Sequence, residues 1–414
     1  MGHRPTVLIA GASIAGPALA YWLDRYGWAT TVVERAPEFR TGGQNIDVRG
    51  AAREVLRRAG LEDAVRDATT GERGTRFFSE HGKLIAEFPV QRSATAGATA
   101  EVEVLRGDLA RILVDKTAGR TGYRYGDEIT ALTDTGSAVE VTFAGGRQEG
   151  FDLVVAADGL RSSTRRLLLD PADVAVRPLG MEMTYLTIAR QDDDTDWWNW
   201  YNAPGGLGVT LRPDRHGTTR AVLSAILYDR AGAADWGRRR TASEQKDRLR
   251  RQFHGVAGPA RRILDALDDA GDMYFESLAQ IRATRWSRGR VALLGDAAWC
   301  AAPVSGMGTT LSIVGAYVLA GEIARHADHR QAFAGYERIM RPFVDRAQQL
   351  PPGVPRIANP RTPAGLAVFH AGLRLAATPL VSRIGARLVD PPADRIDLPD
   401  YADLDQRQDG LDRI

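Results

Sequence analysis

Apolar and polar positions follow two different patterns near the start of the chain. Residues 6–11, TVLIAG, form a short apolar run that ends in glycine, which is typical of a buried strand. Residues 14–27 carry apolar side chains at helical spacing, and residues 30–34, TTVVE, form a second strand-like run. A strand, a glycine turn, a helix and a strand in this order predict a βαβ unit with a parallel sheet.

The same two patterns recur along the rest of the chain. Helical spacing is found over 51–60, 107–118, 308–325 and 329–349, and strands or hairpins are expected over 76–88, 137–158 and 289–296. Strand-like runs fill residues 172–285, with one helix near 243–253, which predicts an antiparallel sheet. A proline-rich connector over 350–363 precedes an apolar helix over 364–389 that Pro379 would kink.

These patterns predict an α/β fold with a Rossmann-like domain, an inserted antiparallel β-sheet domain and a C-terminal helix. We expect residues 1–171 and 286–350 to form the Rossmann-like domain and residues 172–285 to form the inserted domain. Residues 351–414 would supply the C-terminal linker and helix.

Composition narrows the function classes. The 414 residues carry a formal net charge of +2, which argues against a nucleic-acid binder. Cys300 is the only cysteine, so no internal disulfide forms, and no His, Cys or acidic cluster suggests a metal. We expect no signal peptide before the first strand, and no apolar run reaches the roughly 18 residues of a membrane span. We expect a cytoplasmic monomer or homodimer.

The run GASIAG, residues 11–16, is the first candidate for chemistry. In a G-x-G-x-x-G turn, glycines permit a tight turn and close approach of a pyrophosphate to the helix N-terminus. Ser13 replaces the middle glycine but is still small. Glu34 ends the next strand, where an acid can accept hydrogen bonds from ribose hydroxyls. These features favour dinucleotide binding over a plain glycine turn and a solvated strand-end charge.

Two later motifs also follow predicted strands. DGLRSSTRR, residues 158–166, would turn the chain and cap a helix through Ser162 or Ser163. GDAAWCAAPVSGMG, residues 295–308, places Asp296 after a buried strand and glycines before a helix. Ligands bind at this end of the strands in open α/β sheets. Read alone, each motif is also compatible with an ordinary capped helix.

With three motifs in this order, the chain resembles the class A flavoprotein monooxygenases, which include para-hydroxybenzoate hydroxylase and the tetracycline-inactivating monooxygenases. The second motif is similar to D-G-x-x-S-x-x-R of that family, and the third to G-D-A-A-H-x-x-x-P-x-x-G-x-G. The resemblance covers nearly the whole chain. It implies FAD contacts from the three motifs and from scattered loop residues: Gly11, Ser13, Ile14, Ala15, Gly16, Glu34, Arg35, Gly43, Asp47, Arg106, Ile129, Asp158, Gly295, Asp296, Pro303, Gly306, Met307, Gly308, Thr309 and Thr310.

Three positions depart from the family pattern. Trp299 stands where the family usually has His, Thr310 where it has Asn, and Gly315 where it commonly has Asp. Backbone donors are unaffected by these changes, so FAD binding is still expected. Trp299 could instead reshape a wall of the site near the flavin.

The resemblance also implies the reaction. NADPH or NADH would dock transiently and reduce the flavin, and O₂ would then form a C4a-hydroperoxide that hydroxylates an electron-rich ring. The protein would position the reactants and exclude water, and no catalytic residue can be named from the sequence. A flavin oxidase or dehydrogenase on the same scaffold and a non-catalytic flavin-binding protein are alternatives. The run WNWY is similar to part of a flavin-dependent halogenase motif, but Asn202 argues against that reading.

The inserted domain is expected to cover the substrate. Residues 196–202, DWWNWYN, are rich in aromatic side chains, and the whole chain has only three lysines. This composition favours a bulky aromatic or polyketide-like small molecule. The candidate substrate contacts are Met183, Trp198, Trp200, Trp299 and Pro303, although ordinary core packing would also explain any single one of them.

Overall fold

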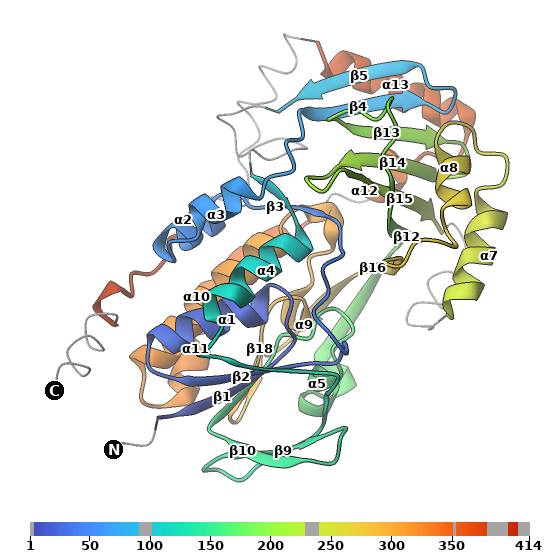
Figure 1. Cartoon of the computed structure of the whole chain (residues 1–414). Helices are drawn as coiled ribbons and strands as arrows, with labels where there is room; N and C mark the ends of the chain where they lie inside the picture. The colour runs from blue at the N-terminus through green and yellow to red at the C-terminus, as the bar shows by residue number, and fades with distance from the viewer. Residues whose placement is uncertain (1–3, 91–101, 228–239, 351–352, 379–395, 405–414) are drawn as a thin grey trace.

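Two large β-sheets organise the chain, one in each half of the view in Figure 1. The structure is a computed structural model and describes residues 4–90, 102–227, 240–350, 353–378 and 396–404. The mixed arrangement of parallel and antiparallel sheets with packed helices confirms the α/β fold that the sequence predicts.

The first sheet has six strands in the order β17-β18-β11-β1-β2-β7. Its strands are β1 (Thr6–Ala10), β2 (Ala29–Glu34), β7 (Gly122–Tyr125), β11 (Leu153–Ala156), β17 (Ser287–Arg288) and β18 (Val291–Leu293). All neighbours pair in parallel except β17 and β18. The central strands are almost wholly buried, because both faces of a parallel sheet are covered. The predicted βαβ unit is confirmed.

Helices cover the upper face of this sheet in Figure 1, and a three-stranded sheet lies below it. The helices are α1 (Ala15–Arg25), α2 (Ala51–Arg58), α3 (Glu62–Asp67), α4 (Arg106–Thr117), α10 (Gly308–Arg325) and α11 (His329–Ala347). The three-stranded sheet contains β8 (Ile129–Asp134), β9 (Val139–Phe143) and β10 (Gln148–Phe151). Helix α10 packs against α1, α2 and α11, which explains why its side chains are apolar on nearly every side.

Short elements join these layers. They are the two-stranded sheet of β3 (Asn45–Asp47) and β6 (Glu103–Leu105), the helices α5 (Ser163–Leu168) and α9 (Asp296–Trp299), and the 3₁₀ turns Pro171–Asp173 and Pro303–Ser305. The predicted strand over 289–296 ends earlier, at Leu293, because Asp296 already begins α9.

The second sheet has seven strands in the order β16-β12-β15-β14-β13-β4-β5. Its strands are β4 (Gly74–Ser79), β5 (Leu84–Pro89), β12 (Val174–Ala189), β13 (Trp198–Ala203), β14 (Leu207–Pro213), β15 (Thr218–Ile226) and β16 (Tyr274–Ala283). Neighbours pair antiparallel except β13 and β4, which are parallel. The hairpin expected over 76–88 is therefore present, and it extends this sheet rather than the six-stranded one.

Helices lie on both faces of the seven-stranded sheet. Helices α7 (Ala242–Gln252) and α8 (Ala260–Asp265) share an apolar core with strands β12, β14 and β15. Helices α12 (Val354–Ala358) and α13 (Pro363–Ala376) contact strands β5, β12 and β13. The expected proline-rich connector therefore contains the helical turn α12. The predicted helix over 364–389 corresponds to α13, and its part from residue 379, including Pro379, lies outside the described residues.

Candidate functional site

The glycine turn between β1 and α1 is packed so tightly that it excludes side chains at two positions. A Cβ atom on Gly11, whose φ is +108°, would lie 2.5 Å from the Ala157 carbonyl oxygen. A Cβ on Gly16 would lie 2.0 Å from the Gly11 carbonyl oxygen. Ser13, at the tip of the turn, is exposed. The turn therefore leaves its outer side open to a ligand, while its inner side packs against the chain after β11.

Glu34 lies beside this turn at the end of β2. Its carboxylate accepts hydrogen bonds from the backbone N–H groups of Ala12, at 3.0 Å, and Ala36, at 2.9 Å. The half-buried carboxylate is thus oriented by the turn itself, as a ribose-binding acid requires. Arg35, the next residue, is exposed.

The second motif is held together by its own side chains. Asp158 accepts hydrogen bonds from the Ser162 hydroxyl and from the Thr164 backbone N–H, the latter at 3.1 Å. Ser162 caps α5 by accepting a hydrogen bond from the Arg165 N–H at 2.8 Å. The Arg165 guanidinium donates to the Ala297 carbonyl at 2.9 Å. This last bond joins the second motif to the third.

The third motif packs against the first. A Cβ on Gly295, whose φ is +62°, would lie 3.1 Å from the Ala15 Cβ. Further along, Ala302 has φ 67° and ψ 151°, and among the described residues it is the only non-glycine with a positive φ. Such backbone conformations persist only where the surroundings enforce them, often at functional sites. Here the Ser305 hydroxyl donates to the Ala302 carbonyl at 2.8 Å.

All three motifs lie at one edge of the six-stranded sheet. Strands β2, β1, β11 and β18 are successive parallel neighbours, and the motifs follow their carboxyl ends. This is the edge where open α/β sheets bind ligands. The helix N-termini of α1 and α10 begin there as well, and their free N–H groups favour electron-rich ligand atoms.

Arg106, the first residue of α4, brings a buried cation close to this edge. Its Nε is buried and has no hydrogen-bond partner among the described residues. A Cβ on Gly43 would lie 2.6 Å from that Nε, so the glycine makes room for the guanidinium. Because a buried donor without a partner is costly, the atom indicates a ligand with an acceptor at this position.

Asp296 faces Arg106 from the start of α9. Burial raises the pKa of the Asp296 carboxyl, while the Cys300 thiol, which donates a hydrogen bond to it, and the charges of Arg106 and Arg165 lower it. A carboxylate at the end of β18 can accept hydrogen bonds from hydroxyls of an extended nucleotide. The residues at this edge therefore fit FAD, with its phosphates, ribose and polyol chain.

Comparison with known proteins agrees with this geometry. The FAD binding domain family matches residues 4–350. Flavin-dependent monooxygenase eupH of Phoma sp. is 36% identical, and the match covers 96% of this chain and 98% of that protein. The chain belongs to the class A FAD-dependent monooxygenases. Its fold matches the crystal structure of tetracycline destructase Tet(51), with a TM-score of 0.80, 28% identity and coverage of 97% of this chain and 100% of that chain.

A third relative shows the same fold with FAD present. Klebsiella pneumoniae HpxO, in a crystal structure with FAD and uric acid, gives a TM-score of 0.71 at 22% identity over 94% of this chain and 97% of that chain. The family match and the similarity to eupH show that the monooxygenase is an FAD-dependent oxidoreductase. In the described part of its chain, no helix is both long and apolar enough to cross a membrane.

The remaining predicted FAD residues of the monooxygenase lie in varied surroundings. Asp47 pairs with Arg49 at 2.8 Å, and Ile129 is buried in the large core that contains the six-stranded sheet. Gly306, with φ +64°, Met307 and Gly308 form the entry to α10, where Thr309 and Thr310 are buried and Pro303 begins a 3₁₀ turn. The FAD roles of these residues stay predictions.

The predicted substrate residues separate into two groups. Strand pairing places Met183, Trp198 and Trp200 on one face of the seven-stranded sheet, the face opposite α7 and α8. Trp299, in contrast, is fully buried, with its ring centroid 4.4 Å from that of Trp286. Its ring is part of the core, but its Nε1, like those of Trp198 and Trp200, is buried without a hydrogen-bond partner among the described residues, and its substrate role stays a prediction.

Two departures of the monooxygenase from the family pattern have one explanation. A Cβ on Gly315 in α10 would lie 3.0 Å from the Trp299 ring. Because the larger ring at position 299 needs this space, only glycine fits at position 315 without a shift. The two positions compensate each other within the core.

Several side chains near the site were not identified from the sequence. Arg212 on β14 forms ion pairs with Glu72, at 2.9 Å, and with Glu103. Its guanidinium carbon also lies 3.9 Å from the centroid of the Trp198 ring. This buried group links the seven-stranded sheet to β6. No local pattern predicts it, because the three charged residues come from distant segments of the chain.

Glu276, Tyr274 and Tyr185 were also missed. They lie on the same sheet face as Met183, and the Tyr185 and Tyr274 rings are stacked with centroids 6.1 Å apart. The alternation of Tyr274 and Glu276 along β16 was the one available signal, since alternate residues of a strand share a face.

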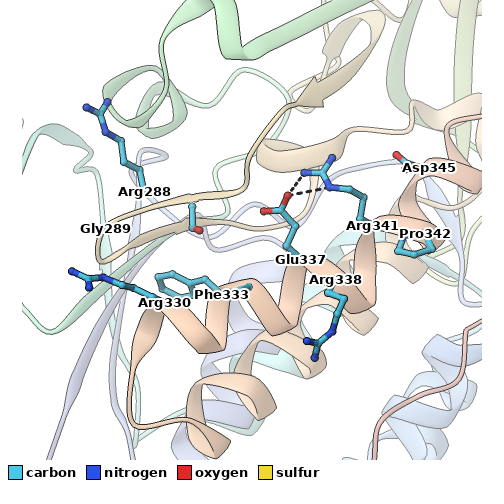
Figure 2. A pocket seen from close by; sticks show the side chains of 11 residues that line it. Arg288, Gly289, Arg330, Phe333, Glu337, Arg338, Arg341, Pro342 and Asp345 are labelled. Carbon is cyan, nitrogen blue, oxygen red and sulfur yellow. Dashed lines mark hydrogen bonds and ion pairs between the residues drawn. The ribbon is translucent and has the colours of Figure 1, made fainter.

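A surface groove of the monooxygenase lies far from these motifs. Figure 2 shows it between α11 and the turn that precedes β18, with Arg288, Arg330 and Arg338 around it and Arg341 paired to Glu337. The turn is at the amino end of β18, whereas the three motifs follow the carboxyl ends of the strands. The groove is therefore separate from the FAD site.

Proposed function

We propose that this monooxygenase uses NADPH or NADH and O₂ to hydroxylate a bulky aromatic or polyketide-like small molecule. The substrate would lie between the FAD site and the face of the seven-stranded sheet that is opposite α7 and α8, called here the substrate face. Aromatic side chains dominate this face: Phe77, Phe88, Tyr185, Trp198, Trp200 and Tyr274.

Two indoles carry the proposal. The Trp198 and Trp200 rings have centroids 4.8 Å apart, and each Nε1 is buried without a hydrogen-bond partner among the described residues. A buried tryptophan usually satisfies its N–H, so two unpaired donors side by side favour a ligand that carries oxygen acceptors. A flat ring with hydroxyl or carbonyl substituents fits both the apolar surface and the donors.

The chain's own residues would hold the cofactor in a fixed orientation. The Gly11–Gly16 turn and the N-terminus of α1 would bind the pyrophosphate, and Glu34 would accept hydrogen bonds from the ribose. Asp296 would accept from the ribityl chain, and the start of α10 would present N–H donors to the flavin ring. FAD, when bound, supplies the redox chemistry with O₂, and the protein excludes water from it.

The proposal also covers the reductant, the oxygen-transfer route, the location and the oligomeric state. Only one dinucleotide motif is found, and it is used for FAD, so NADPH or NADH would dock without a domain of its own. The oxygen-transfer route that the resemblance implies, a cytoplasmic location and a monomeric or homodimeric state are likewise proposals.

Anaerobic titration of the FAD-loaded protein tests this function. We expect NADPH or NADH to bleach the flavin absorbance, and to do so faster with an aromatic substrate from a panel of polycyclic phenols. On admission of ¹⁸O₂, one labelled atom should enter the product. Hydrogen peroxide formed in equal amount with an unlabelled product would instead establish the oxidase alternative. A flavin that neither nucleotide reduces, with any phenol present, would refute both.

A further inference from the structure

Glu276 lies on the substrate face at β16, the edge strand of the seven-stranded sheet. In the sheet register, Glu276 of β16 is opposite Met183 of β12, and Tyr274 is opposite Tyr185. Directly paired residues point to the same side of a sheet. From Tyr185, the cross-strand row continues through Val222 and Thr210 to Trp200. The carboxyl group thus shares its face with the indole that we assign to the substrate, four strands away, which is roughly 19 Å at the usual strand spacing, so only a bulky substrate can reach both.

The charged groups around Glu276 come from the FAD side of the molecule. Asp296, Arg106 and Arg161 all act electrostatically on its carboxyl group. Tyr185, Tyr274 and Cys300 are the other titratable groups in its range. These residues come from β12, β16, α4, α9 and the loop before α5, so Glu276 lies where the substrate face meets the third FAD motif.

Glu276 differs from Asp296 in its bonding. Asp296 accepts a hydrogen bond from the Cys300 thiol, and we assign its carboxylate to the ribityl chain of FAD. Glu276 has no hydrogen bond or ion pair to any of the residues that the structure describes, although its side chain is half-buried. Burial and the charge of Asp296 raise the pKa of Glu276 to about 7, against the lowering effect of Arg106 and Arg161. The group can therefore take up and release a proton near neutral pH.

We propose that Glu276 is the base that accepts the proton of the substrate's ring hydroxyl. This rests on the proposed function, and it deepens it by assigning the substrate to phenols that react as phenolates. The O–H bond of the substrate breaks, the proton moves to a carboxylate oxygen of Glu276, and both electrons stay on the substrate oxygen. Nothing is oxidised in this step, and the proton later returns to solvent.

The surrounding charges favour this transfer. Neutralising Glu276 removes one of two neighbouring negative charges, since Asp296 is the other. The new phenolate remains in the field of Arg106 and Arg161. A simple phenol has a pKa of about 10, so phenols made more acidic by a ring carbonyl match this base better. The structure thus favours acylated phenols over simple ones.

Optical titration of the FAD-loaded protein tests the proposal without turnover. The probes are 4-nitrophenol and 2,4-dihydroxyacetophenone, whose phenol and phenolate forms absorb differently. Wild type should bind them with the phenolate band developing at lower pH than in free solution. Glu276→Gln should retain FAD and bind the probes as phenols, whereas Glu276→Asp should partly restore the phenolate band. Glu140→Gln, an exposed glutamate on β9, is the matched control and should behave as wild type.

Turnover gives a second, separate readout. With a substrate found in the phenol panel, kcat/KM of Glu276→Gln should fall about 10²- to 10⁴-fold, and the rise near pH 7 should disappear. A Gln variant that keeps the phenolate band and the pH profile would overturn the proposal, and so would one that loses FAD. If the wild type binds phenolates but never hydroxylates them, the proposed function fails while the proton-accepting role stands.

Discussion

Replacing Glu276 by glutamine should change how the stability of the protein depends on pH. The pKa of Glu276 is raised from 4.5 to about 7, with burial as the largest cause. Below pH 4.5 the carboxyl is protonated in both the folded and the unfolded state, so the folded state bears no cost for burying an ionised carboxylate. Between pH 4.5 and 7 the folded state binds the proton more tightly, and its relative stability is lost as pH rises. The difference between the two pKa values corresponds to at most about 3 kcal/mol.

The glutamine variant carries no such penalty, so its stability advantage should grow from pH 5 to pH 8. With an unfolding entropy of about 2.1 cal/mol/K per residue, a change of about 0.9 kcal/mol in the free energy of unfolding shifts the Tm of a chain of this length by roughly one degree. The Tm gap between variant and wild type should therefore widen by about 3 °C. Thermal scans of both proteins at pH 5, 6, 7 and 8, with equal flavin content and with Glu140→Gln as control, measure it. A gap that stays constant across this range would refute the reasoning.

Three further substitutions test other parts of the structure. Asp296→Ala should lower FAD retention at least about tenfold, because a charge-assisted hydrogen bond is lost; an unchanged flavin-to-protein ratio after gel filtration would count against the assignment. Gly315→Ala should destabilise the protein by about 1–3 kcal/mol, measured by urea unfolding. Adding Trp299→His to this variant should recover most of the lost stability. If the two substitutions instead destabilise the protein additively, the packing explanation is wrong. Arg212→Met should lower the free energy of unfolding by about 3–5 kcal/mol at pH 8, because it leaves two buried glutamates without their cation. The loss should be smaller at pH 5, because burial raises the pKa of both glutamates and they then become protonated. Equal losses of stability at the two pH values would contradict this.

Local patterns in the sequence carry much of the fold and of the FAD edge. The run TVLIAG predicts a buried strand, and the turn after it tolerates only glycine at positions 11 and 16. The same few residues therefore predict both where the turn lies and that it can bind a ligand. Helix α10 begins and ends where the pattern predicts, because its apolar run is long and is bounded by Gly308 and His326.

Long-range relations could not be predicted in this way. The sheet to which β4 and β5 belong depends on pairing with β13, more than a hundred residues away, and no local signal encodes a partner at that distance. The surroundings of Trp299 could not be predicted for a related reason. It lies within a motif that points to the flavin, but its ring packs against Trp286, a neighbour that only the folded chain reveals.

The parallel pairing of β13 with β4 has a consequence for engineering this enzyme. Exchanging residues 172–285 for the equivalent piece of a relative would replace Trp198–Ala203 but keep its partner strand β4, so the side chains of the two paired strands would no longer match. Deleting the hairpin would expose the backbone hydrogen-bonding groups of β13 along a new sheet edge, and such edges promote self-association. Transplants that aim at new substrate scope therefore need to carry residues 74–89 along with the larger segment.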